Sequence, residues 1–227
     1  MGSPSASRGD DEASGGFPRR MPFWCGLAVA RRSVFALVER TDTLCRHRLL
    51  ASEATRALYP FDFGLEIAHR LDGRTVQQAA RIENRDTRPM PFGFGFHPAF
   101  AWPLPGAASK PHVVRLSGGG SPARRKLVGG LLQRETIPGP FVHGSLEIAD
   151  ALFAEDALVF PDASDALRYG PVDGPGLSFR FSNLPDFALW KPVGAPFLCI
   201  EPWHGTAAVV DEGPQIADRP NTVTLAP

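Results

Sequence analysis

The sequence predicts an all-β protein folded as one antiparallel β-sandwich. Glycine and proline are both abundant, with 23 residues of each, and they are spread along the chain without a period. Such a distribution is typical of many turns between short strands. Segments rich in β-forming residues recur at short intervals, and a length of 227 residues suits a single sandwich domain. Long helices and internal repeats are not indicated.

The predicted domain occupies residues 21–227 and follows a polar tail. Residues 1–20 are rich in Gly, Ser, Asp, Glu and Arg and have almost no apolar side chains. Such a segment buries too little surface to offset its ordering entropy, so we expect residues 1–20 to be disordered. Residues 21–30 hold a short apolar run after two arginines. This run begins late and continues into Arg31, which favours a buried strand or loop over a signal peptide.

Bulk composition argues against several classes of partner. Lys+Arg and Asp+Glu both number 24, and a chain without a basic excess is not expected to bind nucleic acid. No apolar run approaches the ~20 residues that a membrane helix needs. The three cysteines, Cys25, Cys45 and Cys199, are odd in number and widely spaced, which argues against a disulfide framework or a zinc knuckle. A reducing, cytoplasmic location is therefore predicted.

The first strands are predicted between residues 33 and 84. In FDFGLEIAHRL, apolar residues alternate and would place Phe61, Phe63, Leu65 and Ile67 on one face. Asp72-Gly73 follows with a strand on each side, a strong hairpin signal, and residues 83–86 resemble the next turn. The segments expected as strands here are SVFALVE (33–39), CRHRLL (45–50), FDFGLEIAHRL (61–71) and TVQQAARIEN (75–84).

Further strands are predicted in the second half of the chain. They are short, apolar or alternating, and bounded by Gly, Pro, Asp or Ser. Residues 118–130 place Arg124, Arg125 and Lys126 among glycines, and we expect a mobile loop there. The expected strands are HVVRLS (112–117), ALVFP (157–161), LSFRFS (177–182), FALWKP (187–192), FLCIEP (197–202) and TVTLA (222–226).

One candidate for chemistry is His97, in the run FGFGFHPAF (92–100). Pro98 supplies no backbone donor and biases His97 toward an extended backbone, so the histidine is expected at a strand end or a tight connection. The surrounding phenylalanines would suit a wall that stacks on a sugar. Taken alone, the motif is also compatible with a core histidine in an aromatic cluster.

A second candidate is Glu201, in CIEPWHG (199–205). It follows the apolar run that begins at Phe197, so it is expected at the end of a buried strand. A carboxylate there costs free energy unless it is paired, and burial would raise its pKa above the usual ~4.3 and make it a better base near neutrality. The alternative is a glutamate held by a structural arginine. Trp203 beside it would stack on a sugar or pack in the core.

A histidine and a glutamate together suit general acid/base catalysis on a neutral substrate. A metal site would need more ligands; His97, Glu201 and His204 are available, but no tight spacing such as HExxH is present. No G-x-S-x-G segment, Walker A motif or dinucleotide-binding glycine pattern occurs in the chain. We therefore predict a site with no metal and no other cofactor.

Several segments in a fixed order resemble the aldose 1-epimerase (galactose mutarotase-like) superfamily, in its loosely characterised bacterial branch. MPFGFGFHPAF (90–100) is similar to the segment that carries a catalytic histidine, and FLCIEPWHG (197–205) to the segment that carries a catalytic glutamate. The resemblance extends over about residues 31–227. The other similar segments are ALYPFDFGLEIAHRL (57–71), LFAEDALVF (152–160) and LPDFALWKPVGAPF (184–197).

The resemblance implies a β-supersandwich and a cofactor-free aldose 1-epimerase, or mutarotase, that interconverts the α- and β-anomers of a free or phosphorylated aldose. It implies that Glu201 takes the proton of the anomeric hydroxyl and that His97 donates a proton to the ring oxygen. Asp156 would then hold sugar hydroxyls, and Trp190 and Trp203 would line the cleft. Arg31, or the cations at positions 124–126, would serve a phosphate, although solvated surface charge is their simpler role.

The chain also departs from the family pattern. Members have an HGFAR-like segment with another active-site histidine, and the corresponding residues 25–32 here read CGLAVARR, with no histidine nearby. Residues upstream do not resemble family strands, and the sequence stops at TLAP, where a last strand is usual. We therefore expect a chain truncated at its N-terminus and also at its C-terminus, with a sandwich that is incomplete at the N-terminal end.

Two other functions are compatible with these residues. One is a non-catalytic carbohydrate-binding domain or an inactive truncated homologue, because a fold does not fix a function and one active-site histidine is lost. The other is a lyase or glycoside-processing domain, which would need a wider cleft and usually further domains. The expected partner in each case is a small-molecule sugar, and the oligomeric state is left open.

Overall fold

The computed structural model describes residues 29–213 and 215–227. The expected disordered tail over 1–20 and Cys25 lie outside these residues. The described chain is almost entirely antiparallel β-structure, which confirms the predicted fold class. Its helical elements are short: α2 (Glu53–Arg56), η1 (Asp150–Phe153) and η2 (Ile216–Asp218). Within the described ranges, no helix has the length and apolar character needed to cross a membrane.

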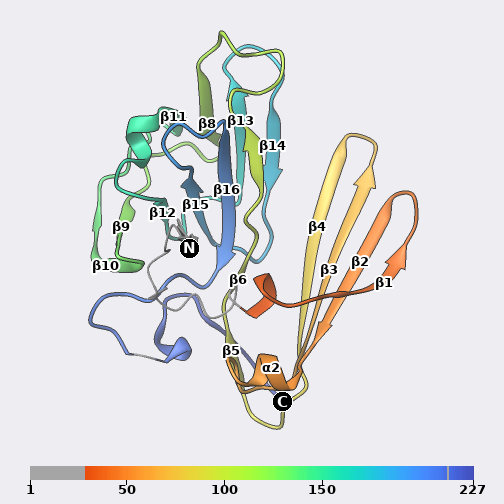
Figure 1. Cartoon of the computed structure of the whole chain (residues 1–227). Coiled ribbons are helices and arrows are strands. Elements are labelled where there is room, and N and C mark those ends of the chain that lie inside the picture. The colour runs from red at the N-terminus through yellow and green to blue at the C-terminus, as the bar shows by residue number, and fades with distance from the viewer. Residues whose placement is uncertain (1–28, 214) are drawn as a thin grey trace, which may run out of the picture.

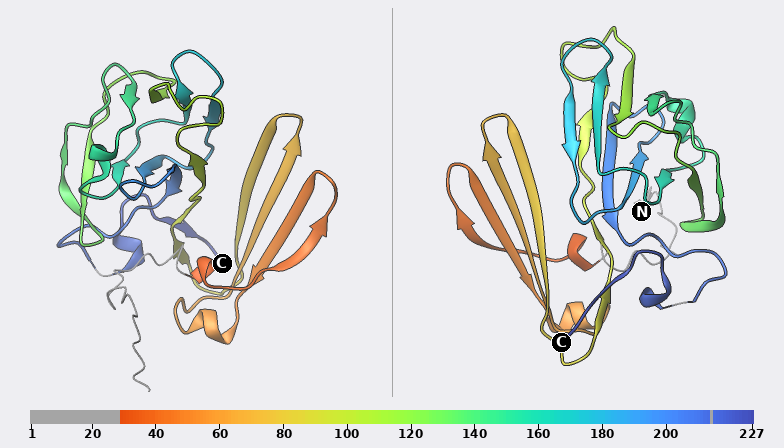
Figure 2. Two further views of the ribbon diagram at one scale, coloured as in Figure 1. Left: turned by 45° about the horizontal axis from the view of Figure 1, so that its top comes forward. Right: turned by 180° about the vertical axis from the view of Figure 1, so that it is seen from behind.

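The N-terminal strands form a separate four-stranded sheet in the order β1-β2-β3-β4. Figures 1 and 2 show this sheet extending away from the rest of the molecule and joined to it at one end. The hairpin predicted at Asp72-Gly73 is present: Asp72 pairs with Thr75, and Gly73 has a φ of 54°, which glycine adopts without strain. The strands are β1 (Ala36–Arg40), β2 (Leu44–Leu50), β3 (Phe63–Asp72) and β4 (Thr75–Asn84).

Apolar packing at the joined end fixes this sheet to the main body. Phe63 and Leu65, two of the residues predicted to share a face, are buried in a cluster with Leu49 and Met90. The far end of the sheet is different, since large apolar side chains such as Leu71 and Val76 are exposed there.

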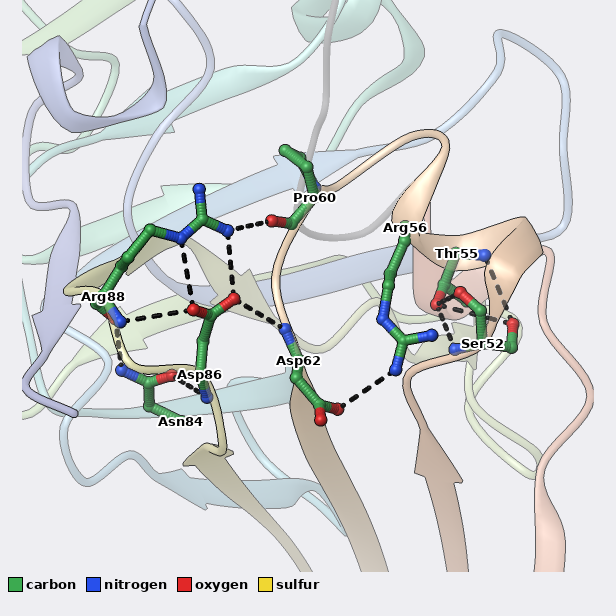
Figure 3. Close-up of polar contacts among 8 residues, drawn as sticks. All are labelled: Ser52, Thr55, Arg56, Pro60, Asp62, Asn84, Asp86 and Arg88. Atoms are coloured by element: carbon green, nitrogen blue, oxygen red, sulfur yellow. Dashed lines mark hydrogen bonds and ion pairs between the residues drawn. The ribbon is translucent and has the colours of Figure 1, made fainter.

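A polar network reinforces the same junction (Figure 3). The Asp86 carboxylate accepts hydrogen bonds from the Asp62 amide at 3.2 Å and from the Arg88 guanidinium at 3.1 and 3.0 Å. Arg88 also donates to the Pro60 carbonyl. These bonds hold the pKa of Asp86 well below its usual range. They connect the loop before β3 to the loop after β4 and so fix the base of the sheet.

The main body is a two-layer sandwich. One layer is a seven-stranded sheet in the order β10-β9-β12-β15-β16-β6, with β7 also paired to β16. The other layer has the order β11-β8-β13-β14. The first layer consists of β6 (Phe94–Gly95), β7 (Ala99–Ala101), β9 (Arg124–Val128), β10 (Leu131–Ile137), β12 (Leu158–Phe160), β15 (Asp186–Trp190) and β16 (Phe197–His204); the second of β8 (His112–Leu116), β11 (Ser145–Glu147), β13 (Ala166–Pro171) and β14 (Leu177–Arg180).

The largest hydrophobic cluster joins the two layers. It draws Phe160, Phe187 and Ile200 from the seven-stranded sheet and Val114 and Tyr169 from the other sheet, all with no measurable exposure. A short two-stranded sheet of β5 (Met90–Phe92) and β17 (Val223–Leu225) connects the body to the N-terminal sheet. One face of the seven-stranded sheet therefore belongs to the core, and the other face is available for a site.

Most predicted strands are present, but two expectations are corrected. Residues 118–130 are not one loop, because Arg124–Val128 form β9 and pair with β10 and β12. Glu201 does not end its strand, since β16 continues through His204. The last two residues of β16 pair with β6, and Trp203 pairs with β15 as well.

Candidate functional site

His97 and Glu201 face each other because two short strands on either side of His97 pair with one strand. β6 pairs Gly95 with Trp203, and β7 pairs Ala99 with Cys199, in a single unshifted antiparallel register. His97 is two residues after Gly95, and Glu201 is two residues before Trp203. The register therefore places His97 directly opposite Glu201.

Two prolines explain why this ladder is interrupted at the site. The Phe96 amide donates to the Pro202 carbonyl at 3.1 Å, and the Ile200 amide donates to the Pro98 carbonyl at 3.3 Å. Each pair lacks its second hydrogen bond, because proline has no N–H. The His97–Glu201 pair lies between these two hydrogen-bonded pairs, so the antiparallel register makes it a non-hydrogen-bonded pair, in which opposed side chains approach most closely. This is a local reason for bringing an imidazole and a carboxylate together.

The two side chains are in contact. His97 Nδ1 lies 3.3 Å from Glu201 Oε1, with 41% of the histidine side chain exposed and only 5% of the glutamate side chain. The histidine therefore contacts both solvent and the buried carboxyl group. A ligand that approaches from solvent meets the His97 ring first, because the Glu201 carboxyl group is almost fully covered.

The surroundings of Glu201 favour its protonated form. Burial raises its pKa from 4.5 to about 8, and the Asp156 carboxylate adds to the rise by electrostatic repulsion. Asp156 is exposed and follows η1 with a φ of 89°, a conformation in which Asp and Asn are enriched among non-glycine residues. Its Oδ1 accepts a hydrogen bond from the Ala157 amide at 2.8 Å. The sequence-predicted residue Asp156 is thus close enough to act on Glu201 electrostatically.

The surroundings of His97 favour its neutral form. Burial and the positive charge of Arg31 lower its pKa below 6.5. Arg31 is exposed, so another of the sequence-predicted residues lies near the pair. At a pH between the pKa of His97 and the pKa of Glu201, the pair holds one titratable proton, and these environments place that proton on Glu201.

Trp190 and Trp203 occupy different environments. The Trp190 ring meets the His97 ring edge-on, with centroids 5.8 Å apart and an interplanar angle of 83°, and it is half-buried. Trp203 is only 2% exposed and packs in the cluster of Leu127, Leu132 and neighbouring residues. The core-packing alternative raised for Trp203 is therefore the one observed, and Trp190 is the tryptophan beside the pair.

Gly95 is required by the packing of Trp203. A Cβ atom at Gly95 would lie 2.2 Å from Trp203 Cδ1 and 2.9 Å from the Pro202 carbonyl oxygen. The indole thus occupies the space above the glycine with which it is paired. Gly95 therefore serves the close approach of β6 to β16.

A thiol that the sequence analysis did not select also lies at the site. Donor atoms of His97, Cys199 and Glu201 all lie within 4.8 Å of one another. Cys199 precedes Glu201 by two residues and so shares its face of β16, a signal that was available in the sequence. His204, considered above as a third metal ligand, is three residues from Glu201, and its Nδ1 is hydrogen-bonded to the Asn183 carbonyl at 2.8 Å.

Comparison with known proteins gives this pair a family context. The family model for aldose 1-epimerase matches residues 26–132, a range that includes His97. Protein LacX of Lactococcus lactis subsp. lactis, in its plasmid-encoded form, is 27% identical over 92% of this chain and 74% of its own length. The chromosomal form of the same protein matches with the same identity and coverage.

Solved structures extend the similarity beyond the segment that the family model matches. A galactose mutarotase related enzyme from Lactobacillus acidophilus superposes with a TM-score of 0.78 at 22% identity, over 87% of this chain and 68% of that one. A galactose mutarotase-like protein from Lactobacillus casei gives 0.71 at 19% identity, over 85% and 68%. The chain is thus similar to the aldose 1-epimerase family over residues 26–132 and shares its fold with galactose mutarotase-like proteins.

Proposed function

We propose that this protein is an aldose 1-epimerase that interconverts the α- and β-anomers of a free or phosphorylated aldose by acid/base ring opening. The observation that carries the proposal is the 3.3 Å contact between His97 Nδ1 and Glu201 Oε1. Ring opening moves one proton off the anomeric hydroxyl and one proton onto the ring oxygen. Both oxygens are bonded to the same carbon, so the base and the acid that serve them must be neighbours.

The proton transfers balance within the pair. Ionised Glu201 accepts the proton of the anomeric hydroxyl, and protonated His97 donates to the ring oxygen. The bond between the anomeric carbon and the ring oxygen breaks, and an aldehyde forms. Rotation about the adjacent carbon–carbon bond followed by the reverse transfers closes the ring as the other anomer. No net proton is consumed, and no redox group is needed.

The shifted pKa values favour the ring-opening step once the reactive form is populated. A glutamate whose pKa is raised to about 8 is a stronger base than usual, and a histidine whose pKa is lowered is a stronger acid. Ring opening leaves a protonated Glu201 and a neutral His97, which is the arrangement that the site prefers. The opposing effect is that, with a pKa of about 8, roughly a tenth of Glu201 is ionised at pH 7.

Neighbouring residues supply binding interactions in this proposal. Trp190, edge-on to His97, would contact an apolar face of the sugar, and Asp156 would accept hydrogen bonds from sugar hydroxyls. Arg31 would bind an anionic substituent where the aldose carries a phosphate. The fully packed Trp203 is left out of the binding surface, although it shares the face of β16 that carries Glu201, and it packs there against Leu127 and Leu132.

Anomer exchange measured by NMR with a panel of aldoses and aldose phosphates tests the proposal. The wild-type protein should exchange anomers faster than the uncatalysed reaction, and Glu201→Gln or His97→Asn should each lower the catalysed rate by about 10²–10⁴-fold. Glu147→Gln and His143→Asn make the same chemical changes at exposed positions and should leave the rate unchanged. Background exchange by a folded wild-type protein would overturn the proposal.

Sugar titrations of the same samples separate the alternative function. Binding without turnover would favour a non-catalytic carbohydrate-binding domain, and binding that survives Glu201→Gln would show that the carboxyl group serves catalysis rather than recognition.

A further inference from the structure

The proposed reaction has no use for the Cys199 thiol, although it lies beside both reacting groups. Its Sγ is one of three donor atoms that all fall within 4.8 Å of one another, with those of His97 and Glu201. The residues directly opposite Cys199 in the ladder are Ala99 on one side and Trp190 on the other, and the small Ala99 side chain does not cover the thiol on the side of His97. Cys199 is 2% exposed, so the thiol is a fixed part of the floor of the site.

Imidazole nitrogen, thiolate sulfur and carboxylate oxygen are the three donor types that Zn²⁺ uses in proteins. Tetrahedral coordination at 2.0–2.3 Å from the metal separates neighbouring donors by roughly 3.3–3.8 Å. The His97–Glu201 separation of 3.3 Å already matches. The longest donor separation, up to 4.8 Å, would have to shorten by only about 1 Å, which a side-chain rotation provides.

We propose that His97, Cys199 and Glu201 bind a thiophilic divalent cation such as Zn²⁺ in a three-ligand site whose fourth position is open to solvent. The protons of the Cys199 thiol and the Glu201 carboxyl group pass to the solvent as the cation takes their place. The Asp156 carboxylate, which acts electrostatically on Glu201, favours the cation. Arg31, which acts on His97, opposes it. Mg²⁺ and Ca²⁺ are not expected to bind here, because they require several oxygen ligands.

A bound cation would inhibit the enzyme. It would occupy the Glu201 oxygen and the His97 nitrogen that the ring-opening reaction needs, so sugar turnover and metal binding exclude each other. This second part rests on the proposed function, whereas metal binding by the three side chains does not.

Titration with Co²⁺ tests the site directly, since a cobalt–thiolate bond gives a charge-transfer absorption. Cys45 is a competing thiol, because its Sγ lies 3.8 Å from the His47 ring, so the full-length Cys25→Ser, Cys45→Ser double variant is the reference protein. We expect that variant to show the absorption, Zn²⁺ to abolish it by displacement, and Mg²⁺ to have no effect. Adding Cys199→Ser should remove the absorption. Its absence from the reference variant, or its survival after Cys199→Ser, would overturn the proposal.

A second variant keeps the test valid if replacement of the buried thiol prevents folding. The His97 side chain is 41% exposed, so His97→Ala in the same double-variant background should fold. The variant should bind Co²⁺ at least about tenfold more weakly, because loss of an outer-shell partner alone has an effect of that size in other metal sites. An unchanged Co²⁺ affinity would contradict the three-ligand site.

Inhibition separates the two proposals. Zn²⁺ should slow anomer exchange by the wild-type protein, EDTA should restore the rate, and higher sugar concentrations should weaken the inhibition. Cobalt–thiolate absorption in a protein without anomer exchange would leave the metal site standing and remove the epimerase. Anomer exchange that is insensitive to Zn²⁺, with no cobalt–thiolate absorption, would support the epimerase and overturn the metal site.

Discussion

The charge of Asp156 is predicted to raise the pKa of Glu201, and Asp156→Asn is the substitution that removes it with least disturbance. Asparagine keeps the side-chain oxygen that accepts from the Ala157 amide at 2.8 Å, and it tolerates the φ of 89° as well as aspartate does. The variant therefore changes one negative charge and little else. We expect the pKa of Glu201 to fall.

The size of the fall is bounded by the environment of Glu201. Its pKa rises from 4.5 to about 8, so the total rise is 8 − 4.5, or about 3.5. Burial is the larger of the two causes and Asp156 the smaller. The Asp156 charge thus accounts for less than half of the rise, and its removal should lower the pKa by less than about 1.7, to a value between about 6 and 8.

A ¹³C-NMR titration of the Glu201 side-chain carboxyl group measures this directly, with the resonance assigned from Glu201→Gln. The same shift should appear in anomer exchange measured in buffer containing EDTA, where kcat/KM falls above the higher pKa of the pair because both protons are then lost. Glu155→Gln removes a neighbouring charge that pairs with Lys126, and it should leave Glu201 unchanged. A pKa that stays near 8 in Asp156→Asn, or an equal fall in Glu155→Gln, would refute the electrostatic assignment.

Three further predictions concern stability and binding. At pH 9, denaturant unfolding of Glu201→Gln should give a free energy of unfolding higher than that of the wild type by at most about 5 kcal/mol, and near pH 4 the two should match. The reason is that a glutamate whose pKa rises from 4.5 to about 8 on folding destabilises the folded wild type as the pH rises through that window. Gly95→Ala should lower the free energy of unfolding by about 1–3 kcal/mol by displacing Trp203, whereas Gly118→Ala, where a Cβ meets nothing within 4 Å, should not. Trp190→Ala should weaken sugar affinity about 2–10-fold in a binding titration.

The strands that the sequence predicted correctly are those with strong local signals. Alternation in residues 61–71 and the Asp72-Gly73 turn specify the β3–β4 hairpin through short-range rules alone. The strand β9 was missed because Arg124, Arg125 and Lys126 lie between glycines, a composition that locally resembles a loop. Its strand conformation comes from pairing with β10 and β12, partners that no local pattern identifies.

The two groups of the site could be named from sequence, but their arrangement could not. Motif resemblance selected His97 and Glu201, and a glutamate after an apolar run correctly predicted burial and a raised pKa. The contact itself depends on a long-range register between residues about a hundred positions apart. The burial of Trp203 also decides between its two alternatives, because a tryptophan on the same face as Glu201 can either contact a ligand or pack against neighbouring side chains. The thiol of Cys199 could not be placed at the site from the number and spacing of the cysteines, which bear only on disulfides and zinc knuckles.

The position of the pair follows from a compromise between sheet stability and chemistry. A central strand supplies a rigid support for Glu201, but such a strand is normally hydrogen-bonded to its neighbours along its whole length. Pro98 and Pro202 each remove one bond from the ladder, on opposite strands and on opposite sides of the His97–Glu201 pair. The pair thus lies in a locally weakened stretch that β6 and β7 hold in register from both ends. Restoring one donor, as in Pro98→Ala, should therefore strengthen the sheet while leaving the two side chains opposed, which would show that the register, rather than the proline, positions the site.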